Sequence, residues 1–194
     1  MLLYRNPKSR LLSLLVLFFF TVTLSQAQQF SLKNTESTLT VLGTSSIHDW
    51  HITTETQSGK IVFIDVNTCK IEKCDISVVA ESLKSGKNSM DKNTYKALKT
   101  DDYKTINFQL TDIKDVSKKE NGTYAVQSLG YLTITGVKKQ ITLNFTVDTS
   151  GGKINLTGEK KIKMTDFNID PPKALFGTIT TGDDLTIKFS TTFL

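Results

Sequence analysis

The sequence predicts an all-β fold, an antiparallel barrel of eight strands with one short helix near residues 89–101. Three observations favour this fold. Residues 28–194 contain 26 Thr, 15 Ile and 9 Val but only 4 Ala, a composition that suits strands and disfavours a helical bundle. Apolar and polar residues alternate with a period of two along most of this part of the chain. Turn signals that contain glycine separate the alternating segments.

The alternation predicts one strand after another. It is clearest in four segments, namely Ile106–Thr111, Tyr131–Thr135, Ile141–Val147 and Leu185–Ser190. Weaker alternation predicts five more strands, at Thr38–Gly43, Trp50–Thr54, Lys60–Val66, Asp75–Ser82 and Lys153–Thr157. These segments give eight or more antiparallel strands, each with one apolar and one polar face, as in antiparallel sheets with one side in water. Closing the sheet into a barrel removes its edges, and eight strands leave room for side chains or one small ligand.

One segment, Ser89–Asp101, breaks the alternation. Met90, Thr94 or Tyr95, and Leu98 recur there at helical spacing, and Ser89 or Asp91 is a candidate N-cap. We expect a short helix that packs its apolar stripe on the sheet and covers one mouth of the barrel.

The first 27 residues have the features of a secretory signal peptide. Met1–Arg10 is basic, Leu11–Leu24 is apolar, and Ser25-Gln26-Ala27 supplies the small residues of a cleavage site. The apolar run is shorter than the roughly 20 residues that span a membrane, which favours cleavage over an anchor. We therefore expect residues 28–194 to form one barrel domain that is periplasmic or secreted and has no membrane span.

The distribution of charge argues against nucleic acid as a partner. Arg5, Lys8 and Arg10 contribute three of the five net positive charges of the chain, which leaves +2 for residues 28–194. These residues contain no Arg, the side chain that most often reads guanine and clamps phosphate groups.

The only cysteines, Cys69 and Cys74, are separated by four residues. If Lys70–Lys73 is a hairpin loop, the two cysteines face each other at its base, and an exported protein permits a disulfide between them. Free thiols are the alternative. The spacing does not fit a redox pair or a metal site.

Residues that could perform catalysis are few. His48 and His51 would point to opposite faces of a strand, so they do not form a metal site together. Ser45 and Ser46 do not lie in a nucleophile elbow, and no glycine loop of a nucleotide site is present. We expect no cofactor and no enzyme activity, although an enzyme that uses His48 on an isoprenoid or acyl substrate stays a third hypothesis.

Four blocks of sequence, in this order and spacing, resemble the YceI-like family of exported bacterial proteins. They are GTSSIHDW at Gly43–Trp50, the stretch from Ser82 to Phe108, LTITGVKKQITL at Leu132–Leu143, and the stretch from Met164 to Ile187. The resemblance covers nearly all of residues 30–194. Two positions depart from the family pattern: Lys104 stands where the family has Pro, and Asn168 stands where it has Gly. Asn tolerates left-handed backbone angles, so the second change is compatible with the fold.

The resemblance implies a lipocalin-like barrel that binds a polyisoprenoid or similar long-chain lipid, such as a quinone side chain, with no established enzyme activity. The inward positions of the strands would then line the ligand: Trp50, Phe63, Phe108, Leu110, Leu132, Ile134, Leu143, Phe145, Ile187 and Phe189. Tyr95, Tyr103 and His48 are candidates for holding a polar head group. The alternative is a stress-response or interaction module in which these side chains fill the barrel. A homodimer stays open in either case.

Overall fold

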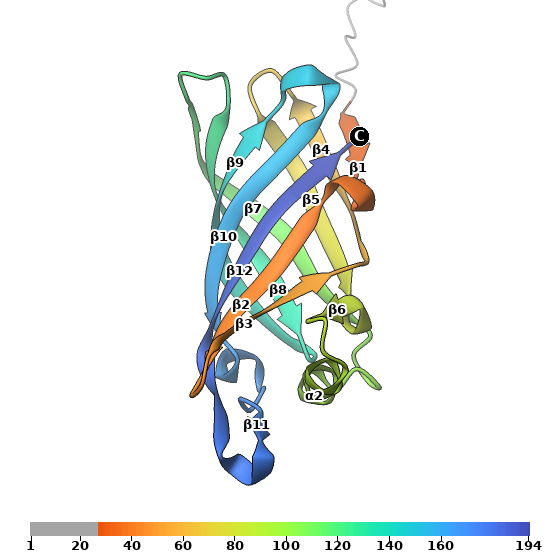
Figure 1. Cartoon of the computed structure of the whole chain (residues 1–194). Helices are drawn as coiled ribbons and strands as arrows, with labels where there is room; N and C mark the ends of the chain where they lie inside the picture. Colours follow the sequence, from red (N-terminus) through yellow and green to blue (C-terminus); the bar gives the residue numbers. More distant parts are fainter. Residues whose placement is uncertain (1–26) are drawn as a thin grey trace, which may run out of the picture.

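The structure of the chain, a computed structural model, describes residues 27–194 and confirms the all-β prediction. The predicted signal peptide lies outside these residues, except for Ala27. A strongly curled antiparallel sheet surrounds a central space, and one α-helix lies at its lower end (Figure 1). The strands are β1 (Gln28–Ser31), β2 (Thr38–Ser45), β3 (Asp49–Thr54), β4 (Gln57–Asp65), β5 (Lys70–Val79), β6 (Leu83–Lys84), β7 (Thr105–Lys118), β8 (Tyr124–Ile134), β9 (Val137–Asp148), β10 (Ile154–Lys163), β11 (Lys173–Ala174) and β12 (Ile179–Phe193).

The predicted number of eight strands is too low. Eleven strands follow one another in the order β1-β4-β5-β7-β8-β9-β10-β12-β2-β3-β6, and β11 pairs with β12 outside this order. Eight of the nine segments expected from the alternation fall on strands to within one residue, whereas Asp75–Ser82 ends in the 3₁₀ helix η3 (Ala80–Ser82) that follows β5. The strands without a predicted counterpart, β1, β6 and β11, have four residues or fewer, which is too short for a pattern of period two to be visible.

The short strand β1 closes the sheet at its upper end. It pairs with β4 along its whole length, and its last residues also meet the end of β12. The Ser31 N–H donates to the Leu194 carbonyl at 2.8 Å, and the Leu194 N–H donates back to the Ser31 carbonyl at 2.9 Å. The backbone groups of β4 and β12 that would otherwise form free edges are thus paired at this end.

Side chains directly opposite each other in an antiparallel pair share one face of the sheet, so the register defines rows across the barrel wall. One inner row runs from Ile76 of β5 through Phe108 of β7 to Leu132 of β8. The alternation seen in the sequence therefore has a direct cause, because every second residue belongs to such an inner row.

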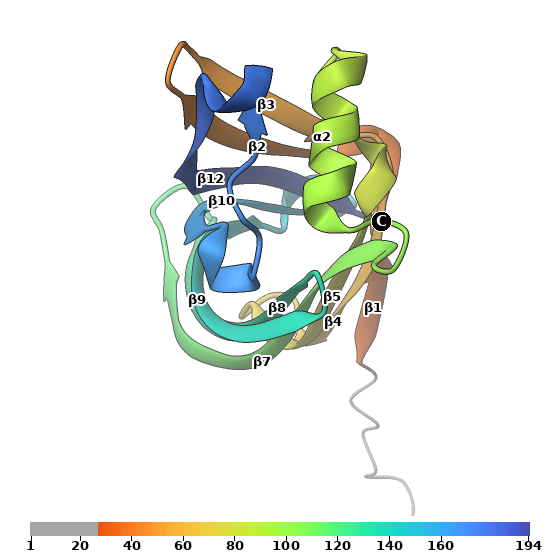
Figure 2. The same ribbon diagram turned by 90° about the horizontal axis from the view of Figure 1, so that it is seen from below.

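The predicted helix is present as α2 (Asn88–Leu98), and Figure 2 shows it lying over one side of the lower end of the barrel. Met90 and Leu98 pack against the sheet, as the helical spacing predicts. The predicted N-cap is wrong: the cap position is Lys87, without a side-chain cap. The Asp91 carboxylate instead accepts hydrogen bonds from the N–H and hydroxyl of Ser85, at 2.8 and 2.6 Å, which ties the loop before α2 to the helix.

The predicted disulfide between Cys69 and Cys74 is also wrong, because both are free thiols. The turn between β4 and β5 lies at residues 66–69, where the Asp65 carboxylate accepts hydrogen bonds from the Asn67 N–H and the Thr68 hydroxyl. Lys70–Lys73 is therefore strand and not loop, and Cys74 lies opposite Ile61 of β4. Asp65 thus stabilises a turn at residues 66–69, whereas the cysteine spacing predicts a loop at Lys70–Lys73. The pairing register of β4 and β5 differs accordingly.

We expect both thiols to be unreactive in the folded protein. Burial raises the pKa of Cys69 to about 11 and that of Cys74 to about 12, so neither is a thiolate at pH 8. Titration with a thiol reagent should give slow reaction in buffer and two fast-reacting thiols per chain in denaturant, with no reductant added. A chain that shows no thiols in denaturant until a reductant is added would contain the disulfide after all.

Candidate functional site: an apolar cavity in the barrel

The upper end of the barrel is filled. A cluster of buried side chains occupies it, which includes Ile61, Phe63, Val147, Ile154 and Phe193. Phe63 is fully buried and meets Phe30 of β1 edge to face, with 6.1 Å between ring centroids. This cluster closes the upper end of the space inside the barrel. We call it the floor, because the mouth of the barrel is at the opposite, lower end.

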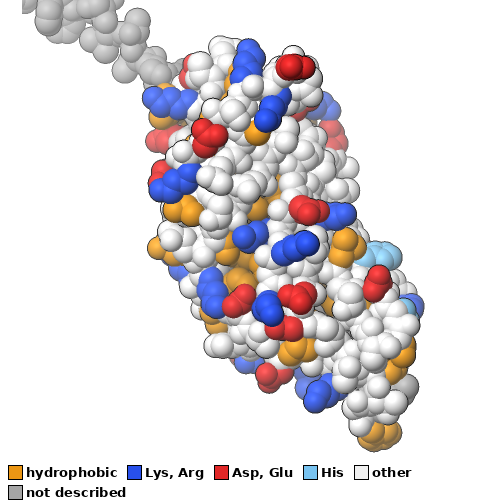
Figure 3. Space-filling model, turned by 90° about the vertical axis from the view of Figure 1, so that its left-hand side faces the viewer, with side chains coloured by type: hydrophobic (Ala, Val, Ile, Leu, Met, Phe, Trp, Pro, Cys, Tyr) orange, Lys and Arg blue, Asp and Glu red, His pale blue; other side chains and the backbone are white. Residues whose placement is uncertain are grey.

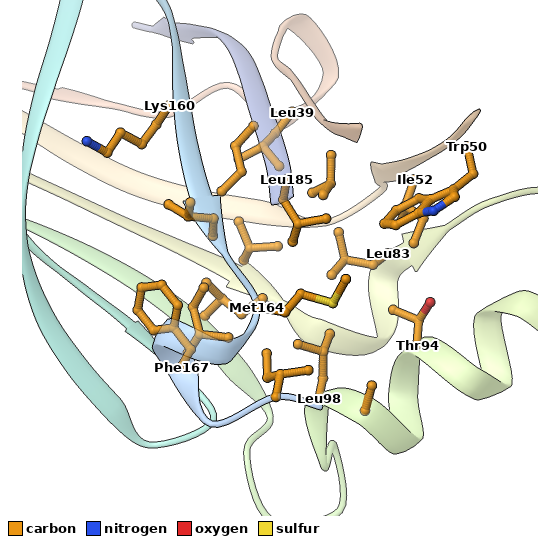
Figure 4. Close-up of a pocket in the computed structure, with 18 of the residues that line it drawn as sticks. Leu39, Trp50, Ile52, Leu83, Thr94, Leu98, Lys160, Met164, Phe167 and Leu185 are labelled. Atoms are coloured by element: carbon orange, nitrogen blue, oxygen red, sulfur yellow. The ribbon is translucent and has the colours of Figure 1, made fainter. Parts of the chain in front are cut away.

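Below this floor the barrel encloses a cavity of about 420 Å³. Of the 40 residues that line it, 30 are apolar, and they come from the strand walls, from α2 and from the segment after β10. Figure 4 shows Leu98 of α2, Leu185 of β12 and Met164 converging on the same space. The volume lies in the range of about 300–1,000 Å³ that is usual for small-molecule sites.

The exposure of the inward side chains supports a real cavity. Ile106, Phe108 and Ile187 line it from β7 and β12, yet each is only partly buried. Apolar side chains at the centre of a filled barrel would be fully buried, as Phe63 is. The lower part of the barrel is therefore hollow.

Nine of the ten residues expected to hold the ligand line this cavity, namely Trp50, Phe108, Leu110, Leu132, Ile134, Leu143, Phe145, Ile187 and Phe189. The tenth, Phe63, belongs to the floor cluster, as Leu110, Leu143 and Phe145 also do, but unlike these three it does not line the cavity. Alternation indicates which face a side chain takes, but not how far along the barrel it lies. Whether the nine contact a ligand stays a prediction.

Two of these rings depend on glycines across the strand pair. The Trp50 ring lies over Gly43 of β2, where an added Cβ would come within 2.1 Å of it. The Phe108 ring lies diagonally over Gly130 of β8, which pairs with Leu110, with 2.4 Å to a hypothetical Cβ. The Trp50 Nε1 donates to the Thr44 carbonyl at 2.9 Å, which fixes the indole at the mouth.

Sequence reasoning missed the part of the lining that follows β10. Met164, Phe167 and Ile169 are buried and line the cavity around the 3₁₀ helix η5 (Thr165–Phe167). The turn is closed by Asn168, whose φ of 55° confirms the left-handed geometry expected there. A single turn has no periodic pattern, so only its place in the fourth sequence block could have indicated it.

The expected head-group residues do not gather at one place. His48 lines the cavity, and its Nδ1 lies 2.9 Å from the Asp49 carbonyl oxygen. The Tyr95 hydroxyl donates to the Glu81 carbonyl at 2.8 Å and so links α2 to the chain before β6. Tyr103 packs against Gly136, away from the cavity. Of the three residues, only His48 is in reach of a ligand.

Within residues 27–194, no group of three or more His, Cys, Asp or Glu side chains is placed to hold a metal ion. In the same residues, no helix has both the length and the apolarity to cross a bilayer.

The turn η5 is held by Asp183, and this contact predicts a pH dependence. The Asp183 carboxylate accepts hydrogen bonds from the N–H and the hydroxyl of Thr165, at 2.9 and 2.7 Å, and these bonds lower its pKa. A lowered carboxyl pKa contributes stability above the unfolded value of about 3.9, and this stability is lost as the pH falls through the folded-state pKa.

We therefore expect Asp183→Asn to lower Tm at pH 7 and to lower it much less at pH 3. Thermal unfolding of both proteins across this pH range measures the difference. A Tm difference that stays constant from pH 7 to pH 3 would show that the charge of Asp183 does not stabilise the turn.

A comparison with protein families matches the YceI-like domain to residues 29–193. No curated protein is significantly similar to the chain. Among solved structures, BcnA of Burkholderia cenocepacia is 17% identical with a TM-score of 0.67, and the alignment covers 83% of this chain and 98% of BcnA.

Two further solved structures are similar. A domain from Saccharophagus degradans, described as polyisoprenoid-binding and implicated in plant cell wall breakdown, is 15% identical with a TM-score of 0.68, over 84% of this chain and 97% of that one. A YceI protein of Campylobacter jejuni is 21% identical with a TM-score of 0.57, over 72% of this chain and 81% of that one. At these identities the likeness establishes a shared fold.

Proposed function

The chain belongs to the YceI-like family, and from this premise we propose that it is an exported lipid-binding protein that holds a polyisoprenoid or similar long-chain lipid in its barrel. The role would be carriage or sequestration of the lipid.

The observation that carries the proposal is the apolar cavity of about 420 Å³ below a filled floor. Each buried CH₂ group contributes about 0.8 kcal/mol, so one five-carbon isoprene unit gives roughly 3–4 kcal/mol before ordering costs. Micromolar affinity corresponds to about 8 kcal/mol, which a few isoprene units supply. A long hydrocarbon chain is thus the class of ligand that this lining suits best.

The likeness to a domain described as polyisoprenoid-binding supports this class of ligand, since the two chains share a fold over 84% of this one. Export rests on the leader in residues 1–27, which has the basic, apolar and small-residue regions of a signal peptide. The periplasm or the medium is the compartment that we propose.

Part of the proposal is that the protein binds without catalysis. The Ser45 hydroxyl donates to the backbone carbonyl of His48 at 2.7 Å rather than to its ring. The Nδ1 of His48 lies next to the backbone carbonyl of Asp49. These contacts stabilise the β2–β3 turn, so both side chains have structural partners.

The alternative hypothesis was an interaction module with a filled barrel. The cavity argues against a filled barrel and favours lipid binding.

The test is extraction of the protein purified from its native host, followed by mass spectrometry of the extract. We expect a prenyl or other long-chain lipid in near-stoichiometric amount. Uptake of the same lipid from detergent-free suspension by emptied protein should restore the complex. Protein that is repeatedly empty and takes up no long-chain lipid would overturn the proposal.

A further inference from the structure

One charged side chain lies in the apolar wall of the cavity. The register across β3, β2, β12 and β10 forms an inner row of Ile52, Val41, Ile187 and Lys160. Ile154, Leu156 and Ile162 occupy the neighbouring inward positions of β10 and are buried. Lys160 thus takes a position that the pattern of the strand reserves for an apolar residue, and it lines the cavity.

The backbone pairing of the barrel wall is interrupted beside this lysine. Pairing between β9 and β10 ends at Phe145 and Gly158, while β10 continues to pair with β12 as far as Lys163. Farther down, η5 lies against β9, where Lys139 and Asp166 form an ion pair at 3.0 Å. Between these two contacts, residues 159–163 of β10 have no backbone partner in β9. We call this stretch the side window.

Apolar side chains line the side window from both strands. Ile141 and Leu143 of β9 and Ile162 of β10 all contact the cavity. Figure 3, which shows the molecule from this side, has apolar side chains among lysines in the middle of the face. In Figure 4 the Lys160 ammonium points away from the apolar side chains around the cavity.

The charges around the cavity have one sign. Its lining includes Lys87, Lys160 and Lys173 and no carboxylate. Lys87 and Lys173 are exposed at the lower mouth, where water and salt screen them, whereas Lys160 is partly buried. Four ion pairs form among the residues that the structure describes, and Lys160 belongs to none of them.

We propose that Lys160 binds the anionic head group of a long-chain lipid, a carboxylate or a phosphate, at the side window while the tail fills the cavity. This inference rests on the proposed function above. A partly desolvated ammonium gains a charge-assisted hydrogen bond from an anionic oxygen, which a neutral head group cannot supply at the same strength. The protein would therefore prefer acidic lipids to neutral lipids of equal chain length.

The test compares three probes that share one tail: hexadecanoate, hexadecyl phosphate and hexadecanol. Binding at neutral pH is measured for the wild type, Lys160→Met and Lys161→Met. Met keeps the length and apolar stem of Lys, and Lys161 is the next residue of the strand, exposed on the outer face. We expect Lys160→Met to weaken both anionic probes by about 10- to 100-fold and hexadecanol by less than about threefold.

Lys161→Met should bind all three probes as the wild type does, and Lys160→Arg should restore most of the affinity for the anions. Equal loss for all three probes in Lys160→Met, with Tm unchanged, would overturn the inference by assigning Lys160 to the apolar lining. Equal effects of the two Met variants would overturn it by assigning the preference to general surface charge. Wild-type protein that binds hexadecanol as well as the anions would overturn the inference and leave the proposed function intact. Protein that binds none of the probes would overturn both.

Discussion

Replacing Ile187 by Trp is expected to abolish lipid uptake while the barrel stays folded. Ile187 lies in the inner row between Val41 and Lys160 and is only partly buried, because its side chain faces the cavity. An indole at this position occupies space that the hydrocarbon tail would use. Loss of two isoprene units of tail burial corresponds to roughly 6–8 kcal/mol, so affinity should fall by at least about a hundredfold.

The measurement is uptake of a prenyl alcohol by emptied protein, followed by extraction and mass spectrometry. Lys188→Trp is the matched control, because Lys188 is the next residue of β12 and is exposed on the outside. We expect Lys188→Trp to bind as the wild type does and Ile187→Trp to keep a Tm within a few degrees of it. If Ile187→Trp takes up lipid normally, the cavity is not the binding site.

Much of the wall of the barrel could be predicted from the alternation alone. In β9 and β12, Leu143, Phe145, Ile187 and Phe189 have the inward parity, and the structure places all four on the cavity. The period-two pattern within a single strand indicates which face of the sheet each side chain takes. This face can therefore be predicted without knowledge of the register between strands.

Features that depend on register or on single turns could not be predicted in this way. The prediction of a disulfide between Cys69 and Cys74 is wrong because Asp65 places the β4–β5 turn earlier in the chain than the cysteine spacing suggests. Lys160 lies in the run Glu159-Lys160-Lys161, after the end of the strand that the alternation predicts at Lys153–Thr157, so its inward position is not predicted. The strand β10 continues to Lys163, and its pairing with Ile187 places this lysine in the wall of the cavity.

The alternation also does not indicate how far along the barrel axis an inward side chain lies. Phe63 allows a test of this third property, because it lies in the filled floor and not at the cavity. We expect Phe63→Ala to lower the free energy of unfolding by about 3–5 kcal/mol, because it removes a fully buried ring from a close-packed cluster. The lipid affinity of the folded variant should stay within about threefold of the wild type, since the ring is not part of the cavity lining. Denaturant unfolding and lipid binding measure the two effects separately.

Phe189→Ala is the matched control, because the same ring is removed from a side chain that already faces empty space. Phe189 is partly buried and lines the cavity, so its loss leaves less close packing to disrupt than the loss of Phe63 does. We expect a smaller loss of stability, about 1–3 kcal/mol, together with altered lipid affinity. If instead Phe63→Ala impairs binding as strongly as Phe189→Ala, the side chains of the floor move to admit the ligand. The tail then extends farther up the barrel than the cavity does.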